Sequence, residues 1–182
     1  MTQLPDPLVF DTGPLRHFAE KGWLGVLKFL AGDRGVLIPE SVERELKRQI
    51  HQLPALDQVL SADWIHVDRS DDVAFVMAFA RYEQRLAVGE QNLGECGVLA
   101  LGNVRGFETV LDDGVPRNLA KDEGIRVTAT LPLLCRAIRE ERLTVPMVEA
   151  LADDLLASTY YLPFETGCFR QWALEQGLIE YK

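Results

Sequence analysis

Acidic residues stand at several points where a predicted strand gives way to a predicted helix. Asp11 directly follows the apolar run Leu-Val-Phe, and the pair Asp112 and Asp113 follows Thr-Val-Leu in the same way. The carboxyl ends of parallel strands share one edge of a sheet, and ligands bind outside that edge. An aspartate before a helix is also a good N-cap. A cap therefore accounts for Asp11 on its own, but it needs only one of the paired acids.

Two glutamates extend this set. Glu95 enters the segment Gly-Glu-Cys-Gly-Val-Leu-Ala-Leu-Gly, which is apolar on every side and predicts a helix buried all round. An acid at that position either interacts with the helix dipole or belongs to a site. In Val-Glu-Arg-Glu-Leu-Lys-Arg-Gln-Ile the inward stripe passes through Val42 and Leu46, and Glu43 and Glu45 both lie at its margins. Periodicity does not choose between these two glutamates, and a solvated helix face is the alternative for either.

A cluster of these carboxylates would need a cation. Two carboxylates about 6 Å apart repel each other by ~3 kcal/mol at an effective dielectric constant of about 20. Mg²⁺ and Mn²⁺ are hard ions that prefer oxygen ligands, so either fits a site made only of carboxylates. Such a cation activates water and stabilises the charge that develops on a phosphoryl group. The chemistry therefore indicates a phosphate ester as the substrate.

The overall charge restricts how a nucleic acid could bind. The 182 residues carry 19 basic and 28 acidic side chains, a formal charge of −9, so the chain lacks the basic character of proteins that hold nucleic acid by neutralising phosphates alone. A nucleic-acid substrate would need local basic groups or bridging metal ions. Arg117 is the strongest such group, because it follows Asp112 within the first turns of a predicted helix. Ordinary surface charge is the alternative.

The elements that position these residues alternate between strand and helix. Short apolar runs rich in β-branched and aromatic residues predict strands at residues 8–10, 36–38, 64–67, 109–111 and 125–127. Helical patterns begin at Gly13 and recur at residues 23–30, 39–49, 115–123, 131–143, 145–157 and 164–177. This order predicts an α/β fold with a mainly parallel sheet of about five short strands flanked by helices. The last three helices form a C-terminal tail that we expect to pack on the sheet.

Location and redox chemistry are indicated by what the sequence lacks. The cysteines, Cys96, Cys135 and Cys168, are far apart and form no Cys-X-X-Cys pair, so we expect buried thiols rather than disulfides or a zinc site. The apolar run at residues 73–80 is far shorter than the ~20 residues that span a bilayer. The N-terminal segment has no basic part of the kind that signal peptides carry. We therefore expect a cytoplasmic protein without membrane contact.

In its motifs the chain resembles the PIN-domain nucleases, and among them the ribonuclease toxins of toxin-antitoxin modules. The resemblance rests on LVFDTGPLRHF, LIPESVERELK, GECGVLALG and TVLDDGVPRNLAKDEGIRVTATLPLL, in the family's order and at similar spacing. It implies one three-layer PIN-like domain over residues 1–182, with an α/β core in 1–130 and a helical tail in 131–182. Two features depart from the family pattern. The turn usually written GTLG reads ATLP here, and the stretch 68–92 is longer.

The resemblance also implies roles for individual residues. It favours Glu45 over Glu43 as the second acid, and it does not choose between the paired aspartates. The implied metal ligands are Asp11, Glu95 and Asp112 or Asp113, with Thr12 supporting Asp11 and Glu45 completing the catalytic acids.

The function implied by the resemblance is that of a Mg²⁺- or Mn²⁺-dependent endoribonuclease acting on RNA, held inactive by a small antitoxin and forming a homodimer. Residues 88–92 and the aromatic stretch 160–164 are the expected contact surfaces, with burial inside the monomer as the alternative for the aromatics. Two other classes compete: an inactive scaffold of the same fold, and a phosphotransfer protein with an aspartate as phosphate acceptor. The second is disfavoured, because Gly13 stands where an aspartyl phosphatase using Asp11 would carry its second aspartate.

Overall fold

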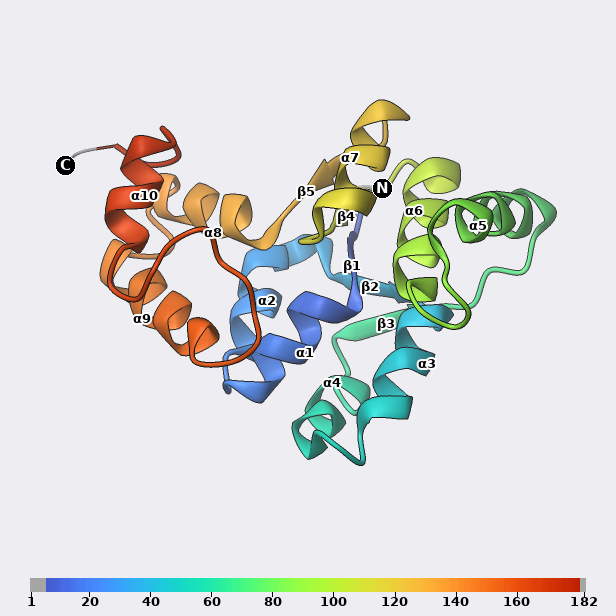
Figure 1. Ribbon diagram of the computed structural model, residues 1–182, viewed down its shortest axis with the longest axis horizontal. Helices are drawn as coiled ribbons and strands as arrows, with labels where there is room; N and C mark the ends of the chain where they lie inside the picture. Colours follow the sequence, from blue (N-terminus) through green and yellow to red (C-terminus); the bar gives the residue numbers. More distant parts are fainter. Residues whose placement is uncertain (1–5, 181–182) are drawn as a thin grey trace.

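The central element is a parallel sheet whose strand order reverses in the middle. The structure, a computed structural model, describes residues 6–180. Its five strands lie in the order β3-β2-β1-β4-β5, and every neighbouring pair is parallel (Figure 1). The strands are β1 (Leu8–Phe10), β2 (Val36–Pro39), β3 (Ile65–Asp68), β4 (Glu108–Val110) and β5 (Val127–Thr128). The chain leaves β1 toward β2 and leaves β4 toward β5, so β1 and β4 flank the switch point at which such sheets bind ligands.

Helices cover both faces of this sheet. The helices are α1 (Thr12–Glu20), α2 (Leu24–Ala31), α3 (Glu40–Gln49), α4 (Asp57–Leu60), α5 (Val73–Leu86), α6 (Leu93–Arg105), α7 (Gly114–Asp122), α8 (Thr130–Arg139), α9 (Val145–Leu156) and α10 (Phe169–Glu175), with short 3-10 turns at Gly32–Arg34 and Pro54–Leu56. α6 packs on β1, β2 and β4, and α5 packs on the outside of α6. α2 contacts β2 and α8 on the other side of the sheet (Figure 1).

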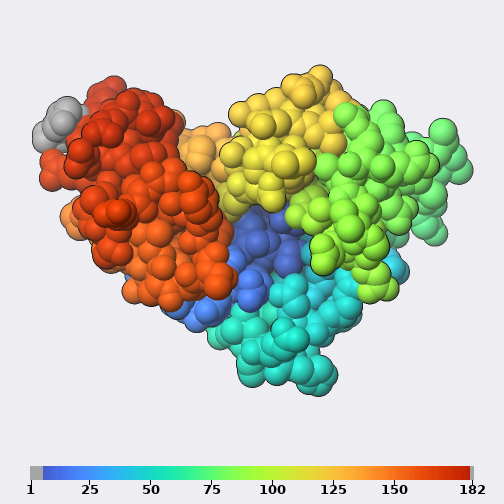
Figure 2. Space-filling model, viewed as in Figure 1, coloured from blue at the N-terminus to red at the C-terminus, as the bar shows by residue number. Residues whose placement is uncertain are grey.

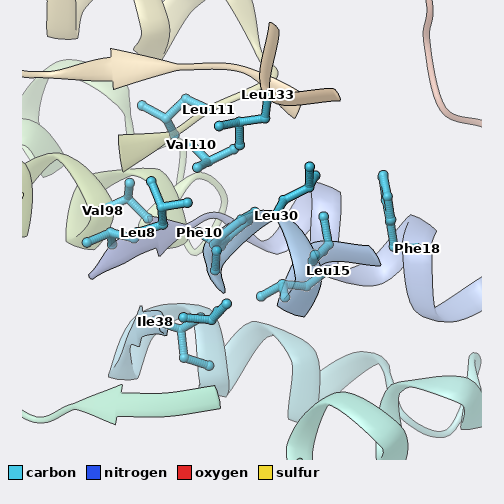
Figure 3. Packing of buried hydrophobic residues seen from close by; sticks show 14 of the residues in the cluster. Leu8, Phe10, Leu15, Phe18, Leu30, Ile38, Val98, Val110, Leu111 and Leu133 are labelled. Carbon is cyan, nitrogen blue, oxygen red and sulfur yellow. The ribbon is translucent and has the colours of Figure 1, made fainter. Parts of the chain in front are cut away.

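The core confirms the predicted α/β fold, with its mainly parallel sheet and flanking helices. Figure 3 shows Leu8 and Phe10 of β1 among side chains from helices on both faces. α6 is buried on almost every side, as its sequence predicts. Buried residues of the C-terminal helices, among them Leu151 and Phe169, belong to the same hydrophobic cluster as β1. Within residues 6–180, no helix is long and apolar enough to span a membrane.

Some boundaries differ from those predicted. The helix expected over residues 131–143 ends at Arg139, because Glu141 adopts a positive φ of 57° that turns the chain. The helix expected over 164–177 begins only at Phe169, after a turn in which Gly167 has a φ of 73°. α5 was not predicted as a helix. Its inward side does form a stripe, made by Phe75, Ala78, Phe79, Tyr82 and Leu86, but exposed apolar residues such as Val73 and Met77 obscure that stripe in the sequence.

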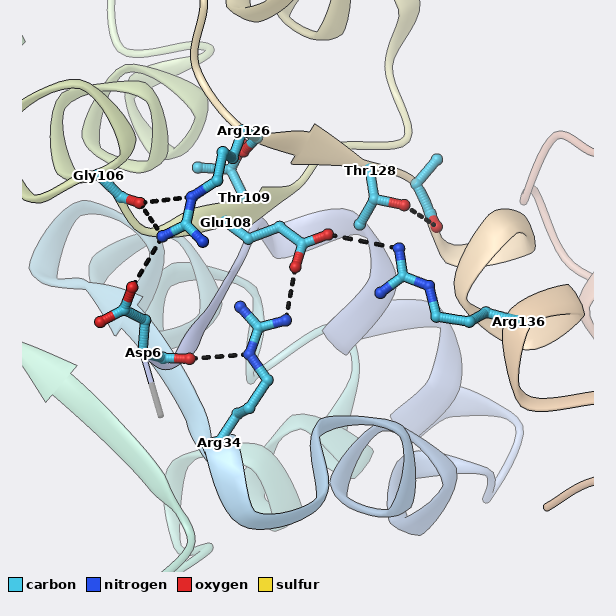
Figure 4. Close-up of polar contacts among 9 residues, drawn as sticks. Asp6, Arg34, Gly106, Glu108, Thr109, Arg126, Thr128 and Arg136 are labelled. Carbon is cyan, nitrogen blue, oxygen red and sulfur yellow. Dashed lines mark hydrogen bonds and ion pairs between the residues drawn. The ribbon is translucent and has the colours of Figure 1, made fainter. Parts of the chain in front are cut away.

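Several arginines tie elements together at the amino edge of the sheet. Glu108, at the start of β4, pairs with Arg34 and with Arg136 of α8 (Figure 4). Arg126 donates to the carboxylate of Asp6 at 2.8 Å and to a backbone carbonyl. These guanidinium groups are occupied by structural contacts, on the side of the sheet away from the carboxylates that follow β1 and β4.

Candidate active site

A pocket of about 490 Å³ lies beyond the carboxyl ends of β1 and β4. Figure 2 shows the molecule hollowed between α7 and the C-terminal tail, with N-terminal residues forming the floor. We call this pocket the acid pocket, because all the acids that the family resemblance implies line it: Asp11, Glu45, Glu95, Asp112 and Asp113, together with Thr12. They come from four different parts of the chain. The fold therefore brings the sequence-predicted acids to one place.

Asp11 both caps a helix and lines the acid pocket. It is the N-cap of α1, and its Oδ2 accepts a hydrogen bond from the backbone N–H of Gly13 at 3.5 Å. Its Oδ1 is buried and has no hydrogen-bond partner within the described residues. Burial, reinforced by the negative charges of Glu95 and Glu45, raises the pKa of Asp11 well above its ordinary value. One oxygen of this carboxylate thus faces its acidic neighbours without a donor.

Glu45 is held by groups from two other helices. Its Oε2 accepts a hydrogen bond from the Thr12 hydroxyl of α1 at 2.6 Å, and its Oε1 accepts one from the backbone N–H of Gly94 in α6 at 2.8 Å. Glu43, two residues earlier, instead pairs with Arg69 and Lys47, both at 2.9 Å. The structure therefore places Glu45 in the acid pocket and Glu43 in an ion-pair network outside it.

Gly94 allows these acids to approach α6. A Cβ atom at this position would lie 2.7 Å from Glu45 Oε2 and 3.1 Å from Asp11 Oδ1. Real Cβ atoms essentially never come within 3.0 Å of another atom, so only glycine fits here without moving the carboxylate of Glu45. Glu95 follows directly, and burial together with the charges of Glu45 and Asp113 raises its pKa. Glycine thus brings the start of the buried helix, and with it Glu95, against the acids of the other elements.

The paired aspartates have different partners. Asp113 is the N-cap of α7, accepting from the backbone N–H of Val115 at 2.8 Å, and it is exposed. The carboxylate of Asp112 accepts from the backbone N–H and the hydroxyl of Thr130, both at 2.7 Å, and from the hydroxyl of Tyr160. The cap uses one aspartate, as the sequence indicates, and the other is oriented by donors from the start of α8 and from the C-terminal tail. Both remain candidates for the last ligand.

Thr130 and Tyr160 are site residues that sequence reasoning missed. Thr130 begins α8 in the ATLP turn, and Tyr160 lies beyond α9 in the C-terminal tail. Burial and the Asp112 charge raise the pKa of Tyr160 well above its ordinary value, so its hydroxyl stays a donor. The sequence offered one indication for Thr130, because the ATLP segment that contains it corresponds to the GTLG turn of the family pattern. No local signal marks Tyr160, because it reaches Asp112 across 48 positions of sequence.

Arg117 lies beside the paired aspartates but does not line the acid pocket. Its Nη1 donates to the carbonyl oxygens of Leu111 and Asp112, at 3.2 and 2.7 Å. The residue lines a neighbouring groove of about 500 Å³, together with Lys121, Tyr160 and Tyr161. Arg117 therefore holds the backbone that carries Asp112, and its role toward substrate stays a prediction.

The donor set of the acid pocket fits a divalent cation in its chemistry. Within residues 6–180, no group of three or more His, Cys, Asp or Glu side chains is already arranged to hold a metal ion. The pocket nevertheless offers only hard oxygen donors, which suit Mg²⁺ or Mn²⁺. Asp11 Oδ1 is buried with no partner among those residues, and the charges of Glu95 and Glu45 oppose the ionisation of Asp11. A cation would relieve both conditions at once.

Comparison with known proteins identifies the family. The family model DUF3368, described as a PIN domain, matches residues 7–166, a range that includes every acid of the pocket and the tail residue Tyr160. No curated protein and no solved structure matches the chain. PIN domains are generally nucleases, and PIN nucleases generally use divalent metals. The match spans most of the chain and agrees with the parallel sheet and its flanking helices, so the protein belongs to the PIN domain family.

Proposed function

We propose that this protein is a Mg²⁺- or Mn²⁺-dependent endoribonuclease that hydrolyses RNA phosphodiester bonds in the acid pocket. The observation that carries the proposal is the buried carboxylate of Asp11, whose Oδ1 has no donor among residues 6–180 and faces the charges of Glu95 and Glu45. Burying carboxylates that repel one another destabilises a fold unless a cation joins them. An inactive scaffold would have no use for such an arrangement, so the enzyme is favoured over that alternative.

The acids of the pocket have different roles in the proposed reaction. Asp11, Glu95 and Asp112 or Asp113 would hold the metal, which when bound supplies activated water and stabilises negative charge on the phosphoryl oxygens. Thr12 and Gly94 fix the carboxylate of Glu45 beside Asp11, which makes Glu45 the candidate to accept a proton from the attacking water. The donors from Thr130 and Tyr160 hold the carboxylate of Asp112, which lines the pocket, in one orientation.

The first test is cleavage of defined single-stranded RNAs with Mg²⁺, with Mn²⁺ and with EDTA. We expect cleavage by the wild type only with metal, and a loss of at least ~100-fold for Asp11→Asn and for Glu45→Gln. Glu43→Gln is the matched control, because it makes the same change on the same helix outside the pocket. Equal cleavage by the wild type and Asp11→Asn would contradict the proposed site.

The second test separates metal binding from catalysis. We expect the melting temperature of the wild type to rise with Mn²⁺ concentration, since ligands that bind only the folded state stabilise it. The rise should be much smaller for Asp11→Asn, which removes a ligand charge while keeping the side-chain size. A metal-dependent rise without cleavage of any RNA would instead favour the scaffold.

The proposal includes the partners implied by the family resemblance: a small antitoxin and a second copy of the chain, in the cytoplasm. Val73, Val76 and Met77 support a contact surface on α5, because they are 73%, 52% and 69% exposed and lie at helical spacing on one side. Of the aromatic stretch, Tyr161 is 85% exposed and Leu162 is buried. Light scattering should show a dimer for the wild type and a monomer for Met77→Lys. A wild-type monomer at high concentration would refute the dimer.

A further inference from the structure

Arg16 lies in the acid pocket and has no anionic partner in the part of the chain that the structure describes. It belongs to the face of α1 that lines the pocket through Thr12, Gly13, Arg16 and His17. Its Nε is buried and has no hydrogen-bond partner, and no ion pair joins the side chain to a carboxylate within the described residues. The positive charge of Arg16 acts on the neighbouring His17, whose pKa is lowered by burial and by this charge. A buried guanidinium N–H without an acceptor is costly, so its retention needs an explanation.

The acids around Arg16 are engaged elsewhere. Glu45 accepts from Thr12 and Gly94, and Asp112 accepts from Thr130 and Tyr160. Asp11 turns one oxygen to the first turn of its own helix. The pocket therefore holds several carboxylates close to a guanidinium group that pairs with none of them.

The other arginines near the pocket are occupied. Arg48, also in the pocket lining, pairs with Glu90 at 2.8 Å. Arg117 uses Nη1 on two backbone carbonyls and faces the neighbouring groove. Among the arginines that line the acid pocket, Arg16 is thus the one whose donors lack an acceptor within residues 6–180.

We propose that Arg16 binds an RNA phosphate in the acid pocket, in a subsite on the floor formed by α1. This inference rests on the proposed function and names the group that receives the substrate. A guanidinium group binds the two non-bridging oxygens of a phosphate through parallel N–H donors, which an ammonium group cannot reproduce. In a chain with an overall charge of −9, such a local cation reduces the repulsion between the carboxylates and the substrate.

The inference is tested with Arg16→Gln, Arg16→Lys and, as a control, Arg44→Gln. Arg44 lies on α3 outside the acid pocket, is 67% exposed and pairs with Glu40, so its replacement removes the same charge from the surface. The probe is one fluorescently labelled single-stranded oligoribonucleotide. Its cleavage is measured in Mn²⁺, its affinity is measured in EDTA by fluorescence anisotropy over a range of KCl concentrations, and Mn²⁺-dependent melting is measured without RNA.

For Arg16→Gln we expect kcat/KM to fall by about 10- to 100-fold, the size of a lost charge-assisted hydrogen bond. The slope of log affinity against log salt should become shallower by about 0.7, the value for one phosphate contact on a single strand. Melting without ligand and the Mn²⁺-induced rise should stay as in the wild type. Arg16→Lys should keep the salt slope but recover only part of the rate, and Arg44→Gln should match the wild type throughout.

Other results would overturn the inference. Wild-type cleavage and salt slope in Arg16→Gln would remove Arg16 from the substrate site while leaving the nuclease function intact. A large fall in melting temperature without ligand, with the salt slope unchanged, would make Arg16 a structural residue. Failure of the wild type to cleave RNA would refute the proposed function. In that case the role of Arg16 in binding phosphate would also be refuted if the wild type bound no RNA in EDTA, or if Arg16→Gln left the salt dependence of RNA binding unchanged.

Discussion

Replacing Gly94 by alanine should disable the acid pocket without removing any acid. The added Cβ would lie 2.7 Å from Glu45 Oε2 and 3.1 Å from Asp11 Oδ1, whereas ordinary contacts begin near 3.4 Å. The Glu45 oxygen must therefore retreat by about 0.7 Å and the Asp11 oxygen by about 0.3 Å. Metal sites tolerate only about 0.2 Å in ligand distances, and a 1 Å misplacement can cost a factor of about 100 in rate. We expect RNA cleavage to fall about 100-fold.

The stability of Gly94→Ala should change little. Alanine favours a helix over glycine by up to ~1 kcal/mol, which offsets part of the loss of the Gly94 and Thr12 hydrogen bonds to Glu45. The displaced atoms are the ends of flexible side chains facing a water-accessible pocket, so they find new positions. We expect the free energy of unfolding to change by less than about 2 kcal/mol, or some 4–8 °C in melting temperature for a chain of this size.

Gly97→Ala, one turn further along the same helix, is the matched control. Its Cβ would clash with Ser41 Oγ and lie 2.9 Å from the ring of Pro39, which is buried at the end of β2 and does not line the pocket. Overpacking of this kind costs about 1–3 kcal/mol. We expect Gly97→Ala to melt lower than the wild type but to keep its Mn²⁺ response and cleavage below that temperature. Full Mn²⁺ stabilisation and cleavage in Gly94→Ala would refute the close approach of α6 to the acids.

Three further predictions concern residues around this site and in the surrounding fold. Tyr160→Phe removes a donor from Asp112, so Mn²⁺ affinity and cleavage should fall about tenfold with little change in melting, while Tyr161→Phe, which changes an exposed ring, should behave as the wild type. Tyr82→Phe deletes a buried hydroxyl that donates to Glu123 at 2.6 Å, so chemical denaturation should show a loss of about 1–3 kcal/mol with unchanged cleavage; no loss would contradict the buried bond. The Arg69 and Lys47 hydrogen bonds lower the pKa of Glu43 to about 2, so its stabilisation is present above pH 4.5 and is lost as the pH falls toward 2. Because the Arg69 and Lys47 side chains are about half exposed, the effect is small. Between pH 4.5 and 2 the wild type should lose only about 1 kcal/mol more stability, measured by thermal melting, than Glu43→Gln loses. Equal losses in the two proteins would contradict the contribution of these ion pairs.

The strands and the acids could be predicted from the sequence because their signals are local. Each strand is a short apolar run, and the acids stand directly beyond strand ends or at a helix start, where parallel topology gathers them. α5 was not predicted in this way, because exposed apolar side chains such as Val73 and Met77 obscure the inward stripe that includes Phe79 and Tyr82. The link from Tyr160 to Asp112 and the unpaired state of Arg16 depend on tertiary packing across the chain, which periodicity does not report.

The choice between a helix cap and a site residue, which the sequence poses for Asp11, proves not to be exclusive. A carboxylate has two oxygens, and Asp11 uses Oδ2 on the first turn of α1 while Oδ1 is buried and has no partner within residues 6–180. The cap fixes the rotamer of the side chain and so fixes where the second oxygen points. Asp113 caps α7 in the same way and still lines the acid pocket. A capping position at a strand end therefore does not argue against a chemical role, because the cap itself holds the carboxylate in place at the edge where a ligand would bind.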